Sequence, residues 1–291
     1  MNRFPHLAQR LFNVPLAVRP EKAEVVVAAL AERLGVTRMV RVDGRELALH
    51  DAAYAGLFGE EPARERPYDV VNGVALIPVE GLLVHKLGSL RPYSGMTGYD
   101  GIRANLFCAL DDPEVKAIVF DIDSPGGEVA GCMDLSDVIF AARGPKPMWS
   151  ILSETAYSAA YAIASATDRI IVPRTGGTGS IGCICMHVDF SRALDAAGIT
   201  VTMIQFGARK ADGAAEIPLS PEALTRFQAD IDACGELFVE TVARNRKLDA
   251  AKVRAQEAGI FRGEKGVAEG LADAVLAPDV AFAALIAELT K

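Results

Sequence analysis

The sequence predicts an α/β fold with a largely parallel sheet, C-terminal helices and a small N-terminal appendage. The run 117–122 (AIVFDI) is continuously apolar, which is typical of a strand buried on both faces of a parallel sheet. Runs of this kind alternate with segments of helical character, and alternation of strands and helices builds a parallel sheet. The charged, proline-marked stretch 59–67 (GEEPARERP) separates this alternation from the residues before it.

The elements follow one another regularly from residue 74 onward. The apolar run 74–79 predicts a strand, and the pair Asp111-Asp112 before Pro113 ends the helix that comes next. The expected order is strand 74–79, helix 100–110, strand 117–122, helix 128–142, strand 147–152, helix 158–166, strand 169–173, strand 181–188, helix 190–197, strand 200–205, a long helix from Pro221 to about Asn245, and two shorter helices.

These elements suggest three parts. Residues 1–67 form an N-terminal arm with one amphipathic helix at 21–34, residues 68–277 form the main domain, and residues 278–291 form a C-terminal helix. The lone amphipathic helix needs a partner surface, so we expect the arm to contribute to assembly.

Composition limits the classes of function. The chain is 51% hydrophobic and 23% charged, which is ordinary for a globular protein. A net charge of −8 without a basic cluster argues against nucleic acid and against anionic membranes as partners. Five scattered cysteines favour reduced thiols in a cytoplasm, and they suggest neither a disulfide framework nor a zinc site. No apolar run approaches the roughly 18 residues of a membrane span, so we expect a cytoplasmic protein without metal or cofactor.

Ser158 lies in the segment 155–161 (TAYSAAY), between a predicted strand and a predicted alanine-rich helix. A helix N-terminus offers free N–H groups and the positive end of the helix dipole. A serine at a helix start is usually a cap, so Ser158 becomes a candidate nucleophile only in the company of other motifs.

The segment 123–127 (DSPGG) follows the buried strand. Ligands of parallel sheets bind at the carboxyl ends of strands, where this turn is expected. Gly126 and Gly127 leave backbone N–H groups unobstructed, as an oxyanion hole requires. An ordinary tight turn is the alternative.

Two further loops supply candidate partners for Ser158. The glycine-rich loop 176–182 (GGTGSIG) lacks the ending of a phosphate-binding loop, and its Ser180 could hydrogen-bond a catalytic amine. The loop 207–213 (GARKADG) carries Lys210, a candidate general base, although a single loop lysine is more often solvated. His187, before Asp189, is the alternative base in a Ser-His arrangement.

Together these motifs resemble the signal peptide peptidase A-like serine peptidases, within the Clp-protease and crotonase-like fold. The resemblance covers about residues 70–277 and rests on 124–127 (SPGG), 157–161 (YSAAY), 178–182 (TGSIG) and the Lys210 loop. It implies a Ser-Lys dyad with Ser158 as nucleophile and Lys210 as base, with oxyanion N–H groups from Gly126 and Gly127. Related peptidases form rings, which implies a homo-oligomer.

The loop 90–99 (LRPYSGMTGY) and the Pro15-Leu16 arm look most similar to the tailed-phage prohead proteases, a family of minor capsid proteins of the lambda protein C type. That resemblance implies protein substrates, namely the scaffold and capsid proteins of a phage or prophage head. Three alternatives stay open: a structural capsid protein with little or no activity, a general cytoplasmic signal-peptide-peptidase-like enzyme, and a crotonase-type acyl-CoA enzyme.

Overall fold

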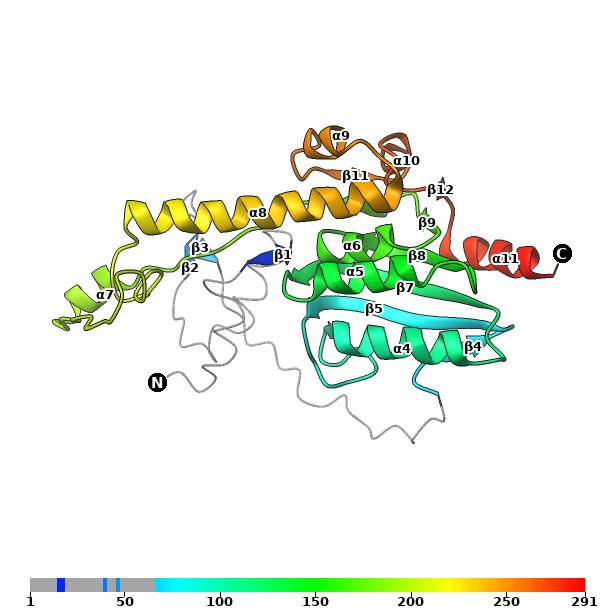
Figure 1. Ribbon diagram of the computed structural model, residues 1–291, viewed down its shortest axis with the longest axis horizontal. Helices are drawn as coiled ribbons and strands as arrows, with labels where there is room; N and C mark the ends of the chain where they lie inside the picture. Colours follow the sequence, from blue (N-terminus) through cyan, green and yellow to red (C-terminus); the bar gives the residue numbers. More distant parts are fainter. Residues whose placement is uncertain (1–14, 19–38, 41–45, 48–65, 291) are drawn as a thin grey trace.

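The computed structural model describes residues 15–18, 39–40, 46–47 and 66–290 (Figure 1). The amphipathic helix expected at 21–34 lies outside these residues. A parallel core of three long strands, β5 (Val74–Val84), β7 (Ala117–Glu128) and β8 (Met148–Ala156), runs through the middle of the molecule. The expected α/β fold with a largely parallel sheet is therefore confirmed.

Short strands extend this core on both sides. The main path of the sheet is β11–β10–β8–β7–β5–β4, with β12 on β9, β9 on β8, β6 on β5 and β1 on β7. The bounds of these strands are β1 (Leu16–Val18), β4 (Asp69–Val71), β6 (Met96–Gly98), β9 (Arg169–Val172), β10 (Gly177–Gly179), β11 (Ile260–Arg262) and β12 (Ala274–Val275). A separate pair consists of β2 (Met39–Val40) and β3 (Glu46–Leu47).

Helices cover both faces of the sheet. The helices α4 (Tyr99–Asp111), α5 (Cys132–Ala141) and α6 (Ala159–Ser165) pack on one face, and α11 (Pro278–Leu289) packs on the other. Within β7, Ile118 and Phe120 face the first layer while Ala117 and Val119 face the second. Double-sided burial explains why this strand is continuously apolar, and each fully buried large side chain contributes about 1.5–3 kcal/mol.

The long helix α8 (Pro221–Arg246) is only half covered. Phe238 and Val242, in its C-terminal part, are fully buried, whereas Leu224, near its start, is exposed. Its N-terminal part reaches beyond the sheet together with α7 (Ser191–Ala196), on the left of Figure 1. The remaining described helices are α9 (Ala250–Arg254) and α10 (Glu264–Ala268), so three helices follow α8 where two were expected.

Two predicted strands, 181–188 and 200–205, were wrong, because these residues form no strand. They belong to the segment that leads through α7 to α8, away from the sheet (Figure 1). A strand needs a neighbour to receive its hydrogen bonds, and β-propensity alone does not supply one. The strand of the glycine-rich loop is instead β10, which starts earlier in the chain.

None of the helices in the described part combines the length and the apolar character that a membrane crossing needs.

Candidate active site

Ser158 lies at the turn where β8 ends and α6 begins. Its backbone has φ 55° and ψ −125°, a conformation that only glycine adopts easily. Two hydrogen bonds hold this turn: the Ser158 N–H donates to the Gly179 carbonyl (2.9 Å), and the Tyr157 N–H donates to the Ser124 carbonyl (3.1 Å). A strained residue costs about 1–3 kcal/mol and is typical of functional sites. This strain supports a catalytic role for Ser158 over a role as a simple cap, and no side-chain cap bond forms.

The surroundings of the Ser158 hydroxyl suit a nucleophile. The side chain is almost fully buried, and its Oγ lies 3.5 Å from the Gly182 carbonyl, at the limit of a hydrogen bond. Ala159 is the first residue of α6, so its N–H has no partner within the helix. This N–H, beside the nucleophile and at the positive end of the helix dipole, is a candidate oxyanion donor. Sequence reasoning missed it, although its position directly after a serine at a helix start was the available signal.

The turn expected at 123–127 is wrong, because these residues belong to β7, and this end of the strand lies against the Ser158 turn. Ser124 connects them, because its carbonyl accepts from Tyr157 while its fully buried Oγ donates to the Gly81 carbonyl (2.6 Å) and accepts from the Gly126 N–H (3.1 Å). A Cβ on Gly127 would lie 1.8 Å from the Leu83 carbonyl oxygen. Glycine is therefore required at position 127 by the close approach of two strands.

The glycine-rich loop forms the other wall. Gly177 pairs with Thr155 of β8, and a Cβ on Gly177 would lie 2.1 Å from the Tyr157 hydroxyl. Ser180 follows Gly179, has a positive φ of 56° and donates its N–H to the Gly259 carbonyl (2.7 Å). The structure thus brings the loop of Ser180 directly beside Ser158.

The two candidate bases lie on the segment that leaves the sheet. Lys210 is exposed in a turn, where its backbone N–H donates to the Gly207 carbonyl (3.1 Å). Among the described residues no hydrogen bond joins Lys210 to Ser158. His187 is half-buried near Asp189. Hydrogen bonds from Ser191 mainly, and the nearby His187 to a lesser degree, lower the pKa of the Asp189 carboxyl. One copy of the chain therefore brings Ser158, the glycine end of β7 and the glycine-rich loop together, and it leaves Lys210 exposed on the segment that leaves the sheet (Figure 1).

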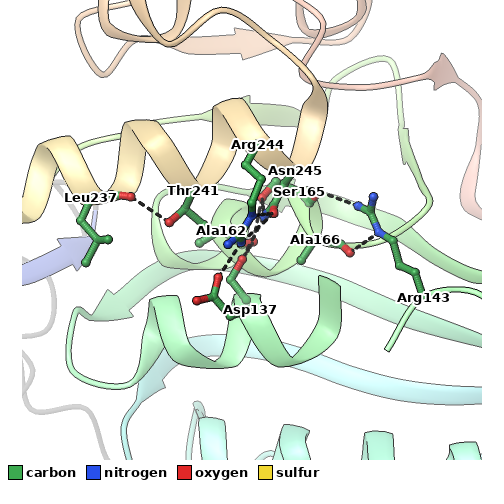
Figure 2. A network of polar contacts seen from close by, with 10 residues as sticks. Asp137, Arg143, Ala162, Ser165, Ala166, Leu237, Thr241, Arg244 and Asn245 are labelled. Carbon is green, nitrogen blue, oxygen red and sulfur yellow. Dashed lines mark hydrogen bonds and ion pairs between the residues drawn. The ribbon is translucent and has the colours of Figure 1, made fainter. Parts of the chain in front are cut away.

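The helix that carries Ser158 at its start is fixed by buried polar contacts (Figure 2). The Asn245 side chain, at the end of α8, donates to Ser165 Oγ (2.9 Å) and to Ser136 Oγ (3.0 Å). Ser136 Oγ in turn donates to the Ala162 carbonyl of α6 (2.9 Å). Arg143 donates to the Ala166 carbonyl (2.7 Å), at the C-terminal end of α6, where positive charge is favourable. These bonds hold α6 against α5 and α8.

Among the residues that the structure describes, no group of three or more His, Cys, Asp or Glu side chains is placed to hold a metal ion. Burial raises the pKa of the Cys183 thiol, next to Gly182, to about 12, so this group stays protonated at neutral pH.

Comparison with known proteins identifies relatives over nearly the whole chain. The chain is 42% identical over 278 residues to the head-tail preconnector protein GP5 of Enterobacteria phage P21, covering 93% of this chain and 55% of that protein. It is 38% identical over 277 residues to the capsid assembly protease C of Escherichia phage lambda, covering 94% of this chain and 63% of that protein. A putative signal peptide peptidase SppA of Enterococcus faecium is 27% identical over 167 residues, covering 57% and 48%.

The chain spans less than two thirds of the length of each of these relatives. Their names agree with both resemblances expected from the sequence motifs. The model of peptidase family S49 matches residues 141–289, which include Ser158, the glycine-rich loop and α8. The chain therefore belongs to peptidase family S49.

Proposed function

We propose that this chain is a serine endopeptidase that cleaves scaffold or capsid proteins while a phage or prophage head assembles. The observation that carries the proposal is the strained conformation of Ser158 at the N-terminus of α6, between two segments that require glycine, the end of β7 and the glycine-rich loop. The names of the two phage relatives support the role in head assembly. In this proposal the enzyme acts in the host cytoplasm or inside the assembling prohead.

In the proposed reaction, Ser158 Oγ attacks the carbonyl carbon of a substrate peptide bond while a neutral lysine amine takes the hydroxyl proton. The N–H groups of Ala159, Gly126 and Gly127 stabilise the oxyanion of the tetrahedral intermediate, and for this the Gly126 N–H leaves Ser124 Oγ (3.1 Å). The protonated amine then gives its proton to the leaving amine, and an acyl-enzyme remains. Water, deprotonated by the same amine, hydrolyses the acyl-enzyme and restores Ser158. Lys210 is the proposed base, with the Ser180 hydroxyl as its hydrogen-bond partner.

Because Lys210 is exposed and the segment around it reaches beyond the sheet, we propose that a neighbouring copy of the chain supplies it. Ile204 and Phe206 on this segment are 95% and 101% exposed, which is unusual for large apolar side chains on a monomer. Burial of these side chains against a second copy would position the loop and would remove the amine of Lys210 from water. A homo-oligomer is thus part of the proposed mechanism.

The test is co-expression with the neighbouring scaffold and capsid proteins, followed by mass spectrometry of the products. Wild-type chain is expected to yield defined fragments, and Ser158→Ala is expected to yield none. Ser153→Ala is the matched control, because Ser153 is an exposed serine of β8, the strand that leads to Ser158, and its Oγ donates to Asp121 (2.5 Å). Fragments that persist with Ser158→Ala would remove Ser158 from the proposed role.

A structural capsid protein with little activity is the second candidate, and the separation of Lys210 from Ser158 within one chain favours it. Labelling of Ser158 by a fluorophosphonate in assembled heads, absent from Ser158→Ala, distinguishes the enzyme from the structural protein. His187 stays the alternative base.

A further inference from the structure

An edge of the central strand β7 loses its partner beside the nucleophile. β8 pairs with β7 as far as the Ser124–Ala156 pair, and the chain then turns at Ser158 into α6. β7 continues to Glu128, and its other side stays paired with β5, where Leu83 lies opposite Gly127. Residues 126–128 of β7 therefore present backbone N–H and C=O groups to the side that β8 has left, and such an edge is a template for another strand.

The chain's own residues 15–18 fill this vacancy. β1 pairs with β7 in antiparallel register, with Leu16 opposite Glu128, Ala17 opposite Gly127 and Val18 opposite Gly126. The Val129 N–H extends the pairing to the Pro15 carbonyl (3.4 Å). β1 is thus an added strand at the position that β8 has left (Figure 1).

The direction of β1 relates it to the nucleophile. Residue numbers in β1 rise as those in β7 fall, so the arm runs from Glu128 toward Gly126 and the Ser158 turn. Gly126 is two residues from Ser124, whose carbonyl holds the Tyr157 N–H. An extended peptide that approached Ser158 along this edge would need the backbone groups that β1 uses, and main-chain pairing of this kind is independent of sequence.

We propose that residues 15–18 are a tethered inhibitory strand, which occupies the substrate-binding edge of β7 until assembly or a competing substrate displaces it. The inference rests on the proposed peptidase function. A tethered strand competes at an effective concentration on the order of millimolar, although its pairing is short. The apparent affinity for a substrate strand is then reduced by the fraction of molecules in which the edge is free. Displacement of the arm couples activity to assembly.

The first test measures binding in full-length Ser158→Ala, so that no cleavage intervenes. The probe is a fluorescein-labelled peptide of residues 13–20 (NVPLAVRP), followed by fluorescence anisotropy. The substitution Ala17→Pro removes the N–H that the register directs at β7, that of Ala17 opposite Gly127, and is expected to tighten probe binding by about fivefold or more. Gln9→Pro, a proline substitution outside residues 15–18, is the control and is expected to bind the probe like the parent.

The second test locks the arm in place. Leu16→Cys with Glu128→Cys puts two thiols directly opposite one another in an antiparallel pair, where a disulfide can form. Oxidation is expected to abolish probe binding, and reduction is expected to restore it, while each single cysteine variant stays insensitive. This variant also covers the case in which the proline variant fails to fold.

A third test measures enzyme kinetics with chains that keep Ser158, and its substrate is fluorescein-labelled casein. The proline variant is expected to lower KM about as much as it tightens probe binding, with kcat unchanged. Unchanged or weaker probe binding in the proline variant, or binding that persists when the arm is locked, would overturn the inference. Tighter probe binding without hydrolysis by any form would support the strand and would overturn the peptidase proposal instead.

Discussion

The backbone N–H of Ser158 donates to the carbonyl of Gly179 with 2.9 Å between nitrogen and oxygen. This bond connects the strand–helix turn to the glycine-rich loop, two segments that are about twenty residues apart in sequence. On the opposite side, the backbone N–H of Tyr157 donates to the carbonyl of Ser124 (3.1 Å). The positive φ of Ser158 persists because both neighbours are fixed, and the strain is a property of the assembled site.

Ser158→Gly is expected to be more stable than Ser158→Ala by about 1 kcal/mol, because glycine adopts φ 55° and ψ −125° without strain. Both variants are expected to be inactive. Urea denaturation of the two proteins, followed by circular dichroism, measures the difference. Equal stabilities would show that the turn relaxes in the variants and that its strain is small.

Lys210→Ala and Lys210→Arg are both expected to abolish cleavage. Alanine has no amine, and the guanidinium of arginine keeps its proton near neutral pH and so cannot act as a base. If the base comes from a neighbouring copy, mixing Ser158→Ala chains with Lys210→Ala chains is expected to restore part of the activity, since some sites then combine an intact serine with an intact lysine. Casein hydrolysis before and after mixing measures this.

Two controls interpret the mixing experiment. The double variant with both substitutions in one chain, mixed with itself, is expected to stay inactive. His187→Ala is expected to retain most of the activity. If His187→Ala were inactive while Lys210→Ala stayed active, the base would be His187. Absence of restored activity on mixing would place the base in the same chain as its serine.

Gly127→Ala and Gly235→Ala are expected to change stability in opposite directions. A Cβ at position 127 would overlap the Leu83 carbonyl oxygen (1.8 Å), so this variant must shift a central strand and is expected to lose at least 2 kcal/mol of stability or fail to fold. Gly235 lies in α8 with no atom within 4 Å of its added Cβ, and alanine there is expected to add about 0.5–1 kcal/mol. Thermal denaturation compares the two.

Asn245→Ala is expected to cost about 2–4 kcal/mol, since Ser136 and Ser165 lose the amide that donates to them in a buried site. Because these bonds hold α6, the rate of Ser158 labelling by a fluorophosphonate is also expected to fall. Arg254→Ala is the control: its guanidinium pairs with Glu236 of α8 (2.5 Å) at 51% side-chain exposure, away from Asn245, and its loss is expected to cost less than about 1 kcal/mol. An equal loss in both variants would contradict a special role for the buried amide.

A chain that starts at residue 68 is expected to be soluble and to melt cooperatively, because every strand of the described sheet except β1, and the helices that cover it, lie beyond that point. It lacks the ion pair of Arg66 with Asp112 (2.8 Å), which is half-exposed and is expected to matter little. A chain that starts at residue 66 is the matched comparison. An insoluble or molten product from both would contradict the domain boundary near residue 67.

The sequence by itself determined the α/β class, the order of most elements and the position of Ser158 at a strand–helix turn. These features are local: an apolar run such as 117–122 is written in consecutive residues, and a helix start or a glycine turn is read within a few positions. The glycine motifs were visible for the same reason, since each marks a place where a backbone or a ring comes too close for a Cβ.

Only the tertiary structure decided what lies against what. The residues 181–188 and 200–205 have strand character, but apart from a single bridge at Ile184 they form no strand, because strand pairing depends on residues far apart in sequence. Lys210 is exposed because its segment, between α7 and α8, extends beyond the sheet with the N-terminal part of α8 (Figure 1). No local sequence pattern predicts that position. The pairing of β1 with residues 126–128 joins segments more than a hundred residues apart in sequence. It arises because β8 leaves the sheet before Ser158, and the backbone N–H and C=O groups that β7 then exposes need new hydrogen-bond partners.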